Sequence, residues 1–216
     1  RKLGQRREAI DLMERLLRWN PNDNQGFRFL IGSDYLRSGN TTKAARMMKK
    51  EADHYPPYQY ELALIDLIAG RSVPAATRLR QAFAANPYIA EILCGMTNPL
   101  PLAIWHGSNL AEPETAQAYV EHCGDLWHRT PDAIPFLRWL HTHPKVLAER
   151  ARIHDIKEQL LWEHDVAKRK KLIDLGEQRL AYIDDTLSKE IVVKQIDRYN
   201  RSIEPWLYPL AESGAR

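Results

Sequence analysis

The amino-acid sequence predicts an all-α fold, a solenoid of helical hairpins followed by a C-terminal long helix or helical hairpin. One spaced pattern occurs three times: a Gly, an Ala five residues later, a hydrophobic residue four after that, and a Pro eight further on. The copies begin at Gly4, Gly39 and Gly70, so they are 35 and 31 residues apart. Self-similarity at this period indicates an array of helical repeats, which usually work by presenting a surface. The pattern therefore favours binding over catalysis.

Helical spacing of apolar residues supports the same fold. Between Arg6 and Trp19 the apolar residues form one stripe opposite a charged face. Pro21 disfavours helix at the residue before it, and Gly39 suits a left-handed helix stop. Repetition of these signals predicts helices over residues 6–19, 25–38, 41–54, 58–69 and 74–85. The short turns between them make neighbouring helices antiparallel.

These repeats resemble the tetratricopeptide repeat family over about residues 1–90. The middle copy matches the family signature best, and the third copy has Asp66 where the family has Tyr. The matching positions are Gly32, Tyr35, Gly39, Ala44, Met48 and Pro56 in the middle copy, and Ala63, Gly70, Ala75, Leu79, Ala82 and Pro87 in the third. The first copy supplies only its second helix, so we expect a fragment of a larger protein. We expect a repeat domain over residues 1–143 and a helical extension over residues 144–216.

The resemblance implies a binding groove, because the first helix of each hairpin lines the inner face in this family. The implied partner-binding residues are Phe29, Ser33, Leu36, Arg37, Tyr60, Leu64 and Leu67. This groove is apolar and lacks the Lys and Asn with which family members hold a peptide's terminal carboxylate. A large exposed apolar patch is uncommon on a monomer. Its occupant is therefore a partner helix or peptide, the rest of this chain, or a second copy in a homo-oligomer.

Beyond the repeats, residues 112–129 and 132–141 have helical spacing of apolar residues, and Asn98-Pro99-Leu100-Pro101 predicts a non-helical link. Two further stripes predict a hairpin of helices over residues 145–163 and 166–203, or one unbroken helix ended by Pro205. Basic and acidic residues nearly balance over residues 145–204, at 13 against 12. That balance favours a protein partner for these helices over a nucleic acid.

Positive charge is uneven along the chain. The net charge is only +3, but residues 1–50 hold twelve Lys or Arg against five Asp or Glu. One sharp basic run, of Lys168, Arg169, Lys170 and Lys171, is a candidate polyanion contact. The alternative for both features is a solvated helix face. A nucleic-acid-associated regulatory protein is accordingly the second functional hypothesis.

No sequence motif for catalysis or metal binding is present. The chain has no His-Glu-x-x-His, no Cys-x-x-Cys and no Gly-rich phosphate loop. Glu121-His122-Cys123 places a base beside a thiol, but neighbours on a helix point about 100° apart. We therefore expect a non-enzymatic interaction scaffold with no cofactor, no metal and no membrane partner. An accessory domain of an enzyme is a further alternative. Two cysteines without a disulfide pattern favour a reducing, cytoplasmic location.

Overall fold

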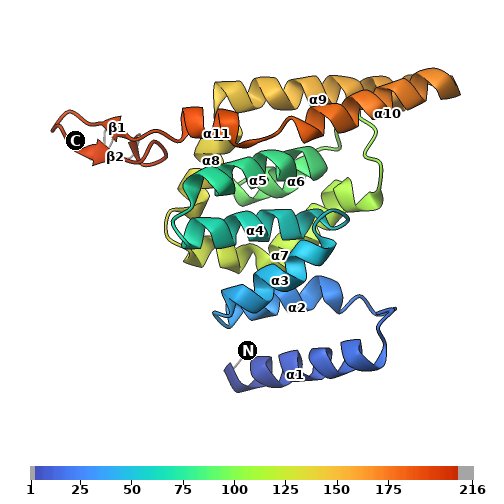
Figure 1. Cartoon of the computed structure of the whole chain (residues 1–216), viewed down its shortest axis with the longest axis vertical. Coiled ribbons are helices and arrows are strands. Elements are labelled where there is room, and N and C mark those ends of the chain that lie inside the picture. The colour runs from blue at the N-terminus through green and yellow to red at the C-terminus, as the bar shows by residue number, and fades with distance from the viewer. Residues whose placement is uncertain (1–2, 209–216) are drawn as a thin grey trace.

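The computed structural model describes residues 3–208 and is all-α, as the sequence predicts (Figure 1). The helices of this part of the chain are α1 (Leu3–Trp19), α2 (Arg28–Arg37), α3 (Thr41–Glu51), α4 (Pro56–Ile68), α5 (Ser72–Ala85), α6 (Pro87–Leu93), α7 (Pro113–Arg129), α8 (Ala133–Thr142), α9 (Pro144–Trp162), α10 (Val166–Ala181) and α11 (Asp185–Ile191). A short 3-10 turn, η1 (Asn109–Ala111), precedes α7, and a two-stranded antiparallel ladder joins β1 (Gln195–Ile196) to β2 (Ser202–Ile203).

Successive helices stack from α1 at one end of the molecule to α9 and α10 at the other (Figure 1). Two corresponding turns have the same backbone geometry. Gly39 and Gly70 have φ of 82° and 71°, a left-handed conformation that costs Gly little. The amide of Asn40 donates to the carbonyl of Tyr35, and that of Arg71 to the carbonyl of Asp66, both at 2.9 Å. Each pair closes the C-terminus of the preceding helix, which is the role the sequence predicted for these glycines.

Small residues allow the helices of the stack to approach closely. Ala44 and Ala75, the Ala positions of the middle and third copies, are fully buried. A Cβ added to Gly32 would lie 2.8 Å from Cζ of Tyr58, closer than real side chains come. Instead the Gly32 amide donates a 3.2 Å hydrogen bond to the Tyr58 hydroxyl. The absence of a side chain at Gly32 is therefore what lets α2 meet α4.

One core runs through the stack and includes helices that the sequence did not place. The short helix α6 begins at Pro87 and was not predicted. Asn86 caps it, its side-chain oxygen accepting from the amides of Tyr88 and Ile89. Helix α7 packs on α6 and α4. Its fully buried Trp127 ring lies 6.4 Å from the Tyr60 ring, edge to face. The prediction of helix over residues 112–129 is confirmed.

The predicted hairpin is confirmed by α9 and α10, whereas the predicted end of its second helix at residue 203 is wrong. Helix α10 ends at Ala181, and Asp184 begins a new helix, α11, by accepting from the amide of Thr186 at 2.9 Å. Buried Arg80 of α5 explains the break, because its Nη1 donates to the Asp184 carbonyl and the Ser188 hydroxyl, both at 2.8 Å. Burying this guanidinium required polar partners that a continuous exposed helix does not supply. Within residues 3–208, no helix is long and apolar enough to cross a membrane.

Candidate functional site

The groove implied by the repeat resemblance is internal. Ser33, Leu36, Tyr60 and Leu64 are at most 4% exposed. Helix α7 packs on α4, and its Asp125 pairs with Arg37 of α2. The Tyr60 hydroxyl donates a 2.6 Å hydrogen bond to the Asn86 carbonyl. The prediction that these four residues contact a partner is therefore corrected: the chain fills its own groove, one of the alternatives left open above.

The other three predicted groove residues are half-buried. Phe29 packs on Tyr55 with ring centres 4.7 Å apart, and Leu67 contacts the edge of the core. Arg37 forms ion pairs with Asp34 on its own helix and with Asp125 of α7, at 3.2 and 3.0 Å. Arg37 also donates to the carbonyl of His122. It therefore fastens α7 over the groove, and its guanidinium is committed within the chain.

A polar cluster lies beneath α7, but its chemistry is that of a core. Glu61 is fully buried and burial raises its pKa to about 7. Burial likewise raises the pKa of the Cys123 thiol to about 12, so the thiol is neutral at physiological pH. The neighbouring His122 is exposed, and its Nδ1 lies 2.8 Å from the Ala118 carbonyl. Cys123 and His122 therefore point to different environments, and the geometry offers no activated nucleophile.

The basic run on α10 divides into two kinds of residue. Lys168, Lys170 and Lys171 are exposed. Arg169 instead donates to the carbonyls of Leu160 and Glu163, and its guanidinium lies 5.0 Å from the centre of the Trp105 ring. Arg169 therefore holds the turn between α9 and α10 against the body. Its place in a polyanion contact is corrected, while the three lysines remain available on the surface.

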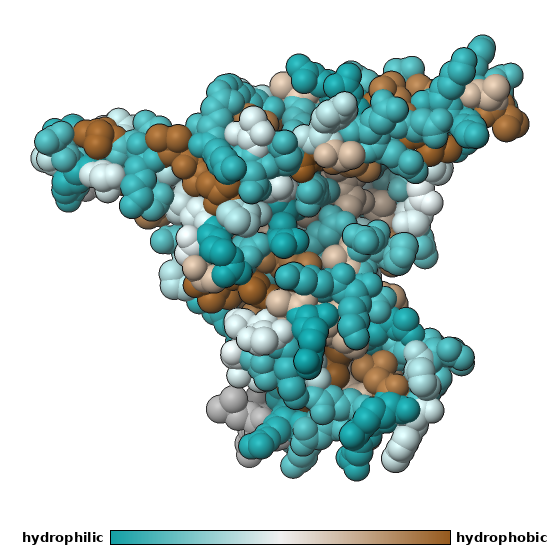
Figure 2. Space-filling view, viewed as in Figure 1, coloured by the Kyte–Doolittle hydropathy of each residue, from teal (hydrophilic) through white to brown (hydrophobic). Residues whose placement is uncertain are grey.

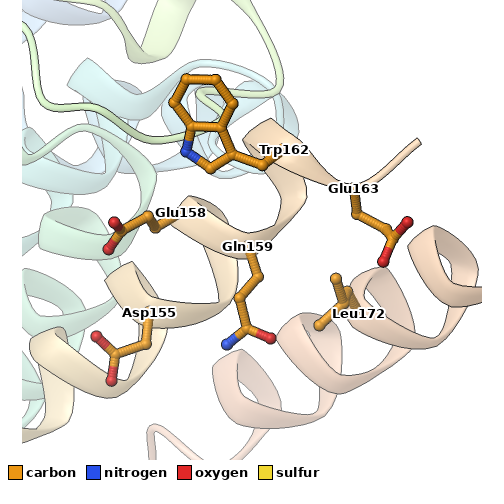
Figure 3. Close-up of a pocket in the computed structure, with 6 residues that line it drawn as sticks. All are labelled: Asp155, Glu158, Gln159, Trp162, Glu163 and Leu172. Atoms are coloured by element: carbon orange, nitrogen blue, oxygen red, sulfur yellow. The ribbon is translucent and has the colours of Figure 1, made fainter. Parts of the chain in front are cut away.

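An open groove with a volume of about 520 Å³ lies between α9 and α10. Figure 3 shows Gln159 of α9 and Glu163, the residue after its end, on the side nearer Leu172 of α10, with Glu158 and Trp162 farther from α10. Spacings of three and four residues place the α9 members on one side of the helix. We call this feature the α9–α10 groove; its residues are Asp155, Glu158, Gln159, Trp162, Glu163 and Leu172.

Apolar side chains are exposed around the end of this helical hairpin. Trp162 is 68% exposed and Val166 is 83% exposed. Figure 2 shows apolar surface at this end of the molecule. Helix α10 has no buried residue and packs chiefly on α9. The sequence analysis missed the groove because it considered only one apolar stripe on each of the two helices. Trp162 set between Glu158 and Glu163 was the signal that could have marked it.

A second groove, of about 590 Å³, lies between α1 and the α2–α3 hairpin. Three of its polar side chains, Glu14, Tyr35 and Lys43, are paired with one another. Glu14 accepts from the Tyr35 hydroxyl at 2.5 Å and from the Lys43 ammonium at 3.0 Å. These contacts lower the pKa of Glu14, the hydroxyl of Tyr35 having the largest effect. The second groove differs from the α9–α10 groove in that basic side chains, Arg6, Arg7 and Lys43, are part of its lining.

Comparison of the chain with protein-family models, with curated proteins and with solved structures gave no match. Among residues 3–208, no group of three or more His, Cys, Asp or Glu side chains is placed to hold a metal ion. A function can therefore be proposed only from the geometry of the chain itself. Of the surfaces described, the α9–α10 groove combines a concave shape, exposed apolar groups and uncommitted charge.

Proposed function

We propose that the chain is a non-enzymatic protein-interaction module. The helical stack of residues 3–143 acts as a scaffold, and the α9–α10 hairpin presents the recognition surface. The observation that carries this proposal is the exposure of Trp162 beside an open groove, on a helical hairpin that packs on the stack through one side. Trp162 lies close to exposed Val166, and exposed apolar side chains that are grouped beside a groove mark interaction sites more often than single ones do. Aromatic side chains are also common anchors in protein interfaces.

The resemblance to tetratricopeptide repeats accounts for the first part of the scaffold in this proposal. We propose that residues 1–90 are tetratricopeptide-like hairpins. The recurring Gly turns at Gly39 and Gly70 and the close approach at Gly32 support it. In this chain the inner face is used to bind α7, so recognition moves to another surface. Free Cys94 and Cys123 agree with a reducing compartment such as the cytoplasm.

Affinity capture with single-residue variants tests the proposal. The tagged chain is used to capture proteins from an extract of its source cells, in parallel with Trp162→Ala and Trp19→Ala. Trp19, on α1, is 77% exposed and lies at the opposite end of the stack, so it is a matched control. We expect a captured protein that Trp162→Ala loses and Trp19→Ala keeps. Equal capture by all three chains would contradict the proposal.

Point variants are preferable to a truncation after His143. Such a truncation removes Glu149, which pairs with buried Arg80 at 2.5 Å, and Ser188, which accepts from the same guanidinium. Leaving a buried guanidinium without partners is strongly destabilising. Loss of binding by the truncated chain would then report unfolding as readily as loss of the recognition surface.

A further inference from the structure

We infer that the α9–α10 groove binds a basic segment of a partner protein, one that places an apolar side chain among Lys or Arg residues. This inference rests on the proposed function and names the chemistry of the partner. Three features of the groove carry it: carboxylates without ion pairs, two apolar side chains in the lining, and a turn that is fixed before the partner arrives.

The charge of the groove comes from three carboxylates. Asp155, Glu158 and Glu163 line it, and no basic side chain does. Within residues 3–208, none of the three forms an ion pair with a basic group within 4.0 Å. Glu163 accepts one local hydrogen bond, from the amide of Asp165 at 2.8 Å. Exposed Lys168, Lys170 and Lys171 of α10 lie close in sequence to Leu172 but do not line the groove, so its lining carries only negative charge. Like charges gathered in a concave surface attract a cationic ligand, so the lining favours a basic segment.

The apolar groups of the groove fit the stems of basic side chains as well as an apolar anchor. Trp162 and Leu172 stand among the carboxylates. Lys and Arg lay their methylene stems on apolar surface while the charged end reaches a carboxylate. A cation over the face of an indole gains a further electrostatic attraction. A metal ion or a small inorganic cation would use the carboxylates but would leave Trp162 uncovered.

The end of the groove is held in place by contacts outside it. Arg169 binds the carbonyls of Leu160 and Glu163 on either side of Trp162, and its guanidinium lies over the Trp105 ring. The Trp105 amide donates a 2.9 Å hydrogen bond to the Lys157 carbonyl, which ties the same loop to α9. A surface ordered in advance loses less conformational entropy on binding. The groove is therefore suited to a short segment that contributes few contacts.

Fluorescence anisotropy with a labelled peptide tests the inference. The probe is a capped 12-residue peptide with four Lys or Arg around a central Leu, and the control peptide has Glu in place of the four cations. We expect saturable binding of the basic peptide alone, weakening several-fold between low and high salt because the charges are exposed. The triple variant Asp155→Asn, Glu158→Gln, Glu163→Gln should weaken binding roughly tenfold, at the usual strength of exposed ion pairs.

A matched triple variant removes the same charge elsewhere. Asp53→Asn, Glu114→Gln, Glu121→Gln alters three exposed acids outside the groove, and it should leave affinity unchanged. Equal weakening by both triple variants, or equal binding of both peptides, would overturn the inference. Binding of a single-stranded oligonucleotide that Lys170→Glu abolishes would also overturn it, in favour of a nucleic acid. If the basic peptide fails while Trp162→Ala still loses a captured protein, this inference falls and the proposed function stands.

Discussion

The Ser33 hydroxyl donates a 2.8 Å hydrogen bond to Oε1 of Glu61, joining α2 to α4 beneath α7. Glu61 is fully buried and Ser33 is 4% exposed. The second carboxyl oxygen of Glu61 has no hydrogen-bond partner within the described part of the chain. An ionised carboxylate with one oxygen unsatisfied is costly in a core, so burial raises the pKa of Glu61 to about 7.

This raised pKa predicts that alkaline pH destabilises the fold through Glu61. A group whose pKa is higher in the folded chain contributes stability that is complete below its unfolded pKa, 4.5, and is lost as pH rises through its folded value, about 7. We expect Glu61→Gln, which keeps an acceptor for Ser33, to remove this dependence. The free energy of unfolding of wild type minus that of the variant should fall by up to about 3 kcal/mol between pH 5 and pH 8.

Denaturant unfolding at a series of pH values measures that difference. Burial lowers the pKa of His141 to about 3 and of His154 to about 4, so both destabilise the fold in acid and oppose the effect of Glu61. Both histidines are present in wild type and variant, and their contribution cancels in the difference. Parallel pH curves for the two chains would contradict a buried Glu61 that titrates near neutrality.

Local signals explain how much of this fold the sequence could predict. Gly39 and Gly70 end helices because Gly tolerates positive φ, and that property is visible in a single residue. The prediction of an open partner-binding groove was wrong because the groove is covered by residues of α7, among them Cys123 and Asp125. These residues are far along the chain from Ser33 and Tyr60. Helical spacing specifies which side of a helix is apolar, and it does not specify which later helix will bury that side.

The helical spacing of apolar residues could not predict the α9–α10 groove, for a different reason. Its shape depends on where α10 turns back, and that turn depends on Arg169 meeting the Trp105 ring and the Leu160 carbonyl. The sequence analysis predicted the same role, contact with a polyanion, for all four residues of the basic run, Lys168 to Lys171. Only tertiary contacts distinguish the structural arginine from the exposed lysines beside it.

Tyr60→Asp should unfold the stack. Tyr60 is fully buried, between the Phe83 and Trp127 rings, and its hydroxyl binds the Asn86 carbonyl. A carboxylate there is buried in the core and its smaller side chain leaves a cavity, a combination that costs several kcal/mol. Tyr60→Phe, the matched control, loses only one hydrogen bond and should cost about 1 to 3 kcal/mol. Thermal unfolding followed by circular dichroism distinguishes the two. A folded Tyr60→Asp chain with wild-type Tm would mean that the residue faces solvent after all.

Gly32→Ala should destabilise the chain although Ala is the better helix former. The new Cβ would meet the Tyr58 ring at 2.8 Å and Cγ of Met48 at 3.0 Å. Overpacking of this kind costs about 1 to 3 kcal/mol, more than the ~1 kcal/mol that Ala gains in a helix interior. Gly176→Ala on α10 is the control, since its Cβ would meet Ile156 at an ordinary 3.7 Å. We expect a lower Tm for the first variant and an unchanged or higher Tm for the second. A higher Tm in both variants would show that helix propensity, and not packing, governs Gly32.

Arg80→Met should release α11 from the body and leave the helical stack folded. Arg80 is 2% exposed, pairs with Glu149 of α9 at 2.5 Å and binds the Asp184 carbonyl and Ser188 hydroxyl. Removing one member of a buried ion pair costs about 3 to 5 kcal/mol because the remaining polar groups lose their partner. We expect faster amide exchange across residues 183–191 than across α4.

Lys145→Ala is the control. It breaks the exposed pair with Glu190, which also joins α9 to α11, and it should cost at most about 1 kcal/mol. Equal protection of α11 in Arg80→Met and wild type would show that the apolar contacts of Ile183 and Ile191 suffice to hold this segment.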